Sequence, residues 1–78
     1  MKAEQMTIAI HTEWIPLDKL LKFAGVVETG GQAGELIATG QITLNQAPVR
    51  EKRKKIRPGD VVAIGDELIL TISEEDAQ

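Results

Sequence analysis

The sequence predicts an α+β domain in which two short, closely packed helices are followed by a small, mainly antiparallel sheet. Two stretches carry apolar residues at intervals of three and four, which is the spacing of a helix with one buried face. After Gly40 the pattern changes to short apolar runs separated by turn residues, as is typical of strands. A single domain is expected over residues 6–73, with frayed ends at 1–5 and 74–78.

A short strand is predicted first, at residues 6–10, because Met6, Ile8 and Ile10 stand at every second position. A strand with this alternation buries one face and exposes the other. His11 falls on the face opposite the isoleucines, and we expect it at the surface.

The first helix is predicted over residues 16–24. Pro16 suits the first helical position, because its ring fixes a helical φ and its missing N–H is not needed there. Gly25 can end the helix in a left-handed conformation. The apolar stripe consists of Leu17, Leu20, Leu21 and Ala24.

The second helix is predicted to begin at Thr29 or the glycines after it, which would cap it, and to end near Gly40. Its apolar positions are Ala33, Leu36 and Ile37. Only a few residues separate the two helices, so they must pack closely. Gly34 costs about 1 kcal/mol relative to alanine inside a helix, so packing on the neighbour must hold this one.

The sheet is predicted from three later runs, at residues 41–44, at 61–64 and around Leu68, Leu70 and Ile72. Turns between them are expected at Asn45-Gln46, at Pro58-Gly59-Asp60 and at Gly65-Asp66. Ile56 is the only apolar residue in a run of cations, and we expect it to anchor that run to the core.

Residues 50–57, called the basic segment below, hold six of the nine Lys and Arg residues of a chain whose net charge is −3. The segment carries +5, since Glu51 is its one carboxylate, and the rest of the chain carries −8. Like charges this close repel one another unless an anion is meant to lie there, and a phosphate backbone is the expected anion. The alternative from charge alone is a solvated loop that keeps an acidic protein soluble.

Composition narrows the classes of function. There is no cysteine and only one histidine, His11, so disulfides and thiolate or histidine-rich metal sites are excluded, and no metal or cofactor is expected. The acidic end, Glu74 to Asp76, is expected to be a solvated tail. No apolar run is long enough for a signal peptide or a membrane span, so a cytoplasmic protein without membrane contact is expected. The remaining carboxylates and lysines are not paired by any catalytic motif, so we do not expect an enzyme.

Four motifs in order resemble a known family. They are LDKLLK at residues 17–22, Gln32-Ala33 with Leu36-Ile37 before Gly40, ITLN at 42–45 and KKIRPGD at 54–60. This series resembles the RNA-binding domain named after small-subunit ribosomal protein S4, also called the alpha-L motif. The match covers residues 15–64, and Thr29-Gly30-Gly31 is similar to the small stand-alone bacterial members.

The resemblance implies binding of structured RNA, mostly ribosomal or transfer RNA, by the paired helices and the loop that follows. A phosphate would approach the start of the second helix, where N–H groups are free and glycines leave the backbone open, and the basic segment would lie beside it. The implied contacts are Lys19 and Lys22 on the first helix, Thr29, Gly30, Gly31 and Gln32 at the start of the second, and Lys54, Lys55 and Arg57, to which the basic segment adds Arg50, Lys52 and Arg53.

The chain departs from the family pattern at two positions. Members usually carry Lys or Arg where this chain has Gly34, so one phosphate contact is missing and weaker RNA binding is expected. Members usually have Asn-Gly where this chain has Asn45-Gln46, so the hairpin should be somewhat strained.

The two aromatic residues are expected mainly to pack. Trp14 is interpreted as a core or edge residue, with base stacking as its alternative, and Phe23 as a packing residue. Recognition is therefore expected through phosphates and RNA shape and not through base reading.

The expected function is that of a monomeric protein that recognises structured RNA, above all ribosomal RNA, and acts in ribosome assembly or quality control, with a ribosomal subunit as a candidate partner. The alternative is a protein–protein interaction module of the same fold with weak or lost RNA binding. The net charge of −3 and the missing cation at Gly34 favour that alternative.

Overall fold

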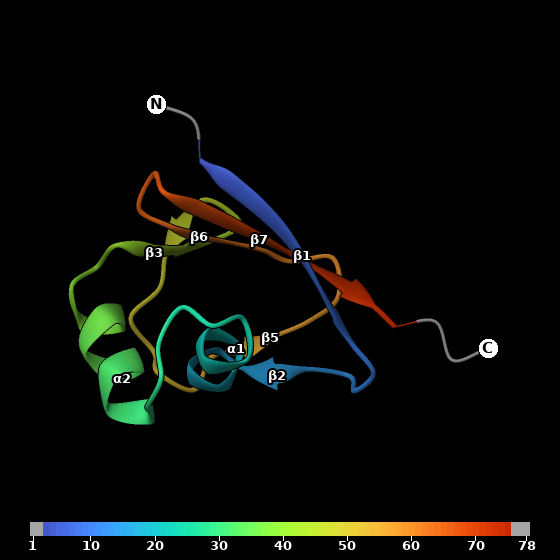
Figure 1. Cartoon of the computed structure of the whole chain (residues 1–78), viewed down its shortest axis with the longest axis horizontal. Coiled ribbons are helices and arrows are strands. Elements are labelled where there is room, and N and C mark those ends of the chain that lie inside the picture. Colours follow the sequence, from blue (N-terminus) through green and yellow to red (C-terminus); the bar gives the residue numbers. More distant parts are fainter. Residues whose placement is uncertain (1–2, 76–78) are drawn as a thin grey trace.

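The computed structural model describes residues 3–75 and has two layers, a sheet on one side and two helices with a two-stranded ribbon on the other (Figure 1). In chain order the elements are β1 Glu4–Ile10, β2 Ile15–Pro16, α1 Leu17–Phe23, α2 Gly30–Ala38, β3 Ile42–Leu44, β4 Ala47–Pro48, β5 Lys55–Ile56, β6 Val61–Ile64 and β7 Leu68–Glu74. The predicted α+β class and the pair of packed helices are therefore confirmed.

The large sheet has five strands in the order β1-β7-β6-β3-β4. The neighbours β7, β6, β3 and β4 pair antiparallel, as predicted, but β1 runs parallel to β7, so the sheet is mixed. The prediction of a sheet formed only after the helices needs this correction. Alternation of apolar residues shows that β1 is a strand, but it does not tell which partner the strand takes.

The first and last strands in the chain, β1 and β7, extend beyond the limits predicted for the domain. β1 begins at Glu4 and β7 ends at Glu74, and the two pair over their whole length from Glu4 with Leu68 to Ile10 with Glu74. Residues 4, 5 and 74, which the sequence predicted to be frayed, are therefore held in place by backbone pairing between the two strands. The predicted frayed ends at residues 1–2 and 76–78 lie outside the described residues.

Pro16 is extended, with φ −63° and ψ 145°, and not the first helical residue that the sequence predicted. It belongs to β2, where Ile15 pairs with Ile56 and Pro16 with Lys55 of β5. The fixed φ of proline is compatible with both helical and extended backbone. The pairing with β5 therefore determines that the ψ of Pro16 is extended. The helix ends at the predicted place, with Gly25 at φ +79°.

α2 begins as predicted, with Thr29 as its N-cap. The Thr29 hydroxyl accepts a hydrogen bond from the Gln32 backbone N–H at 3.1 Å, and the Gln32 side-chain oxygen accepts one from the Glu28 N–H at 2.8 Å. Two N–H groups at the helix start are thus satisfied locally, in the manner of a capping box.

The core lies between the two layers and draws on both. The largest fully buried side chains are Leu17, Leu20 and Leu21 of α1, Ile37 of α2, Ile56 of β5, and Ile42, Val62, Leu70 and Ile72 of the sheet. Ile56 is therefore the core anchor that the sequence predicted. None of the helices within residues 3–75 is long and apolar enough to cross a membrane.

Candidate nucleic-acid interface

The backbone of the basic segment is fixed to the start of α1. The Leu17 N–H donates to the Lys54 carbonyl at 2.9 Å, and the Asp18 N–H donates to the Lys52 carbonyl at 3.0 Å. These are two of the N–H groups at the helix start that have no acceptor inside the helix. Carbonyl groups of the basic segment therefore accept these two N–H groups of α1, and the same bonds fix the backbone of the segment beside the helix start.

A second set of hydrogen bonds fixes the far end of the basic segment. The Asp60 carboxylate accepts from the Arg57 N–H at 2.8 Å and from the Asn45 side-chain amide at 3.1 Å. The Asn45 side-chain oxygen accepts from the Val61 N–H at 2.9 Å. The Pro-Gly-Asp turn is thus tied to the β3–β4 hairpin, where Asn45 and Gln46 have the positive φ values of 51° and 74°. The sequence predicted turns at Asn45 and Asp60, but it did not predict that their side chains connect the two turns by hydrogen bonds.

Lys52 lies over Gly34 of α2. A Cβ placed on Gly34 would lie 3.6 Å from both Lys52 Cδ and Lys52 Cε and 3.7 Å from Lys52 Nζ. The absence of a side chain at Gly34 thus leaves room for the lysine of another segment. Lys52 therefore provides a cation beside position 34 of α2, although Gly34 itself carries no charge.

Arg50 lies at the other end of α2. A Cβ on Gly40 would be 2.8 Å from Arg50 Nη2, a contact that the flexible arginine could relieve, and it is the φ of +80° that favours glycine there. Arg50 is therefore beside the end of the helix and not beside residues 29–32. The basic segment was expected to lie beside the second helix, and it runs past α2 from the end of the helix towards its middle.

The start of α2 is open, but its polar side chains are already engaged. The side-chain oxygens of both Thr29 and Gln32 accept the capping hydrogen bonds described above. A Cβ on Gly30 would meet open space, and one on Gly31 would meet only the Thr29 hydroxyl, at 3.8 Å. Neither glycine is required by the turn, since neither has a positive φ. Their N–H groups, as the first two of the helix, lack intrahelical acceptors.

Trp14 and Phe23 lie at the surface beside the cations. The Trp14 side chain is 37% exposed and that of Phe23 is 64% exposed, so the prediction that Phe23 packs is wrong. The helical stripe through Leu17, Leu20 and Leu21 turns inward and leaves position 23 on the outer side. Lys55 Nζ lies 4.9 Å from the centre of the Trp14 ring, which is within the range of a cation–π contact.

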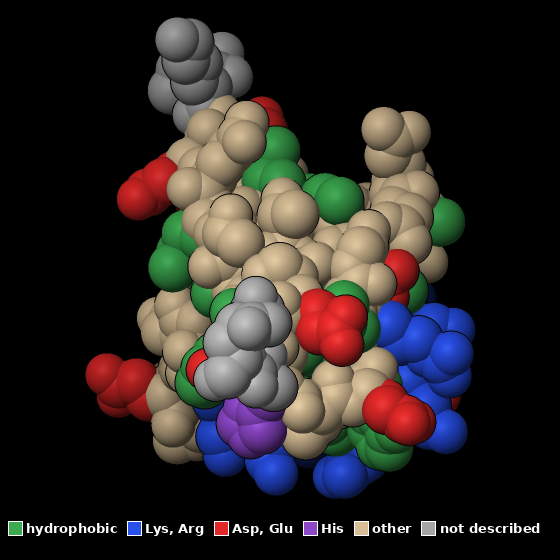
Figure 2. Space-filling view, turned by 90° about the vertical axis from the view of Figure 1, so that its right-hand side faces the viewer, with side chains coloured by type: hydrophobic (Ala, Val, Ile, Leu, Met, Phe, Trp, Pro, Cys, Tyr) green, Lys and Arg blue, Asp and Glu red, His purple; other side chains and the backbone are tan. Residues whose placement is uncertain are grey.

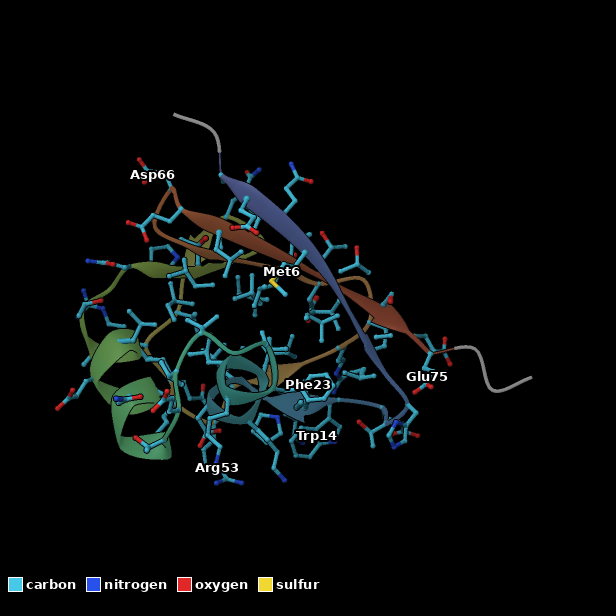
Figure 3. All side chains as sticks on the ribbon, in the orientation of Figure 1. Met6, Trp14, Phe23, Arg53, Asp66 and Glu75 are labelled. Atoms are coloured by element: carbon cyan, nitrogen blue, oxygen red, sulfur yellow. The ribbon has the colours of Figure 1, made fainter. Side chains whose placement is uncertain are left out.

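The cations of the described residues lack carboxylate partners. Within residues 3–75, no Lys or Arg nitrogen lies within 4.0 Å of a carboxylate oxygen, and an ion contact is instead found between His11 and Glu75, at 3.2 Å. All the predicted basic site residues are exposed except Lys54, which is half-buried. Figure 2 shows Lys and Arg side chains gathered along the lower edge of the molecule, and Figure 3 shows Arg53 there, pointing away from the body of the domain.

The structure therefore brings the basic segment beside α1. Lys52 and Lys55 are exposed on the basic segment, and Lys19 and Lys22 are exposed on α1. The arrangement can hold several phosphates. Within the described residues, no three His, Asp or Glu side chains are grouped so as to hold a metal ion.

The sequence was compared with known proteins. A family model described as the S4 domain matches residues 8–72. The chain belongs to the S4 domain family. This is the RNA-binding type of domain that the sequence motifs resemble, and the matched range includes every strand and helix that carries the site. A relative from Bacillus subtilis (strain 168), named "Probable ribosome maturation protein RlbA", is 37% identical over 57 residues, which are 73% of this chain and 80% of that protein.

Proposed function

We propose that this S4 domain binds structured RNA, with ribosomal RNA as its principal target, through phosphate and shape contacts. The observation that carries the proposal is the cluster of cations that have no carboxylate partner within residues 3–75 and whose backbone is fixed to α1. Because the backbone of the segment is already fixed, it loses little conformational entropy on binding, and the cluster remains repulsive until an anion neutralises it.

The proposed surface has three parts. Its centre consists of Lys19, Lys22, Lys52, Arg53 and Lys55, flanked by Lys54 and Arg57. The N–H groups of Gly30 and Gly31, at the positive end of α2, supply a second phosphate contact, for which Thr29 and Gln32 shape the helix start. Arg50 would contact RNA only where the RNA extends past the end of α2.

The relative named "Probable ribosome maturation protein RlbA" supports a role in ribosome maturation. We place this role in the cytoplasm, in assembly or quality control of a ribosomal subunit, with the protein acting by binding and not by catalysis. The positive charge of the site is not neutralised from within the described part of the chain, and this supports a phosphate backbone over the protein-interaction alternative.

A salt titration of binding to a structured RNA hairpin tests this proposal. If roughly three phosphates are neutralised, a plot of log K against log salt should have a slope of about −2 to −3, with low-micromolar or weaker affinity. A flat plot, or no binding even at low salt, would contradict the proposal and favour the protein-binding alternative.

Gly31→Val is expected to weaken RNA binding about tenfold, which is the effect of losing one hydrogen bond to a charged group. The branched side chain would block the approach of phosphate to the backbone, but in the free protein its Cβ would meet only the Thr29 hydroxyl, at the ordinary contact distance of 3.8 Å. Stability should therefore change by less than about 0.5 kcal/mol, because glycine and valine are both weak helix formers.

Ala38→Val is the control for this variant, since Ala38 is an exposed residue at the other end of the same helix. Its RNA affinity should match that of the wild type. Fluorescence anisotropy with labelled RNA and thermal melting by circular dichroism measure the two quantities. If Gly31→Val keeps both its stability and its RNA affinity, the start of α2 is not a contact.

A further inference from the structure

A shallow hollow of about 250 Å³ lies between the end of β1 and α1. Trp14 and Phe23 line it, together with Ile10, Ile15 and Pro16, so most of its wall is apolar. Figure 3 shows the two aromatic side chains near one another at this place. Pockets for drug-sized ligands measure roughly 300 to 1,000 Å³, so this hollow suits a single planar ring system.

Cations stand at the edge of the hollow. Lys19 lines it, and Lys55 lies against the Trp14 ring with its ammonium group 4.9 Å from the ring centre. The carboxylate of Glu75 is held at the His11 side of the rim, 3.2 Å from the imidazole. If an apolar ring system bound in the hollow, a negatively charged group attached to it would therefore be attracted towards Lys19 and Lys55.

The hollow is continuous with the proposed RNA surface. Lys19 belongs to both, and Lys55 joins Trp14 to the basic segment. Nucleotides combine the two properties that the site offers to a ligand, because each has a flat base that stacks on aromatic side chains and a phosphate that binds a cation. An apolar peptide side chain would use the walls of the hollow but would leave these two cations without a partner.

We infer that the hollow receives one unpaired base of the bound RNA, stacked against Trp14 and Phe23, while the phosphates beside that base lie against Lys19 and Lys55. This inference rests on the proposed RNA binding and adds a preference to it. RNA with an unpaired nucleotide next to a helix should bind more tightly than a fully paired RNA of the same length.

The test compares a hairpin that carries a single-base bulge with a fully paired hairpin. Trp14→Ala should weaken binding of the bulged RNA by about 5- to 100-fold, which corresponds to one lost stacking contact, and should hardly change binding of the paired RNA. Phe23→Ala should act in the same direction with less risk to the fold, because its side chain is 64% exposed. Trp14→Phe should restore part of the preference.

Val61→Ala is the matched control, because Val61 is as exposed as Trp14, at 37%, and lies on β6. It should leave both affinities unchanged. The chain has one tryptophan, so its fluorescence reports the site directly and should be quenched by the bulged RNA and much less by the paired one.

The outcomes separate this inference from the proposed function. If both RNAs bind the wild type with a steep salt dependence, but Trp14→Ala and Phe23→Ala weaken both equally or neither, RNA binding stands and the base site is wrong. If neither RNA binds at low salt, both proposals are wrong. If the aromatic variants abolish only the binding of a ribosomal protein, the hollow is a protein-docking site and the inference is overturned.

Discussion

Neutralising Lys52 and Arg53 together, by Lys52→Gln and Arg53→Gln, is expected to weaken binding to structured RNA by about 100-fold at low salt. Each lost charge-assisted hydrogen bond to phosphate contributes about 1.5 kcal/mol or more, and a factor of ten corresponds to about 1.4 kcal/mol. The slope of log K against log salt should also become shallower by about 2, since roughly one unit is lost for each phosphate contact.

The fold should survive these two substitutions. Both side chains are exposed, and α1 is capped by the Lys52 carbonyl, which glutamine retains. Gln5→Glu with Thr7→Glu is a matched control, because it changes the net charge by the same amount on the exposed face of β1. The control should lose only a small part of the affinity. Equal losses in the two variants would mean that net charge, and not the basic segment, determines RNA binding.

Ile56→Ala is expected to destabilise the domain by about 2 to 5 kcal/mol, the usual cost of emptying the site of a buried isoleucine. Ile56 is completely buried and pairs with Ile15, so it joins the basic segment both to the core and to β2. A domain of this size has a free energy of unfolding of only about 5 to 15 kcal/mol, so much of it would be lost.

Urea denaturation measures this loss, with Val61→Ala as the control at a partly exposed site. The control should cost less than about 1 kcal/mol. RNA affinity of the folded Ile56→Ala protein should also fall, because the basic segment would be less well ordered. A loss of stability below about 1 kcal/mol would show that β5 does not depend on this anchor.

Local signals in the sequence were sufficient for the helices and the turns. Thr29 and Gly40 mark the two ends of α2, and the structure places a cap and a left-handed residue there. Gly25 ends α1 for the same reason. These residues act on their immediate neighbours, so their effect can be predicted without knowledge of the rest of the fold.

Features that depend on distant pairing could not be predicted. The parallel pairing of β1 with β7 and the extended conformation of Pro16 are both decided by partners about 40 residues or more away along the chain. The position of Lys52 over Gly34 also depends on how two segments pack. Phe23 was misjudged because a helix of only seven residues has too few apolar positions to define where its buried face ends.

Backbone amide chemical shifts, recorded while a short RNA hairpin is added, test most directly whether the start of α2, the face of α1 and the basic segment form one RNA-binding surface. The account predicts that the amides of Gly30 and Gly31 shift together with those of Lys19 and of residues 52–57, at the same RNA concentration, while those of Gln5 and Thr7 on the exposed face of β1 do not. Shifts confined to the basic segment, with Gly30, Gly31 and Lys19 unchanged up to saturation, would contradict it.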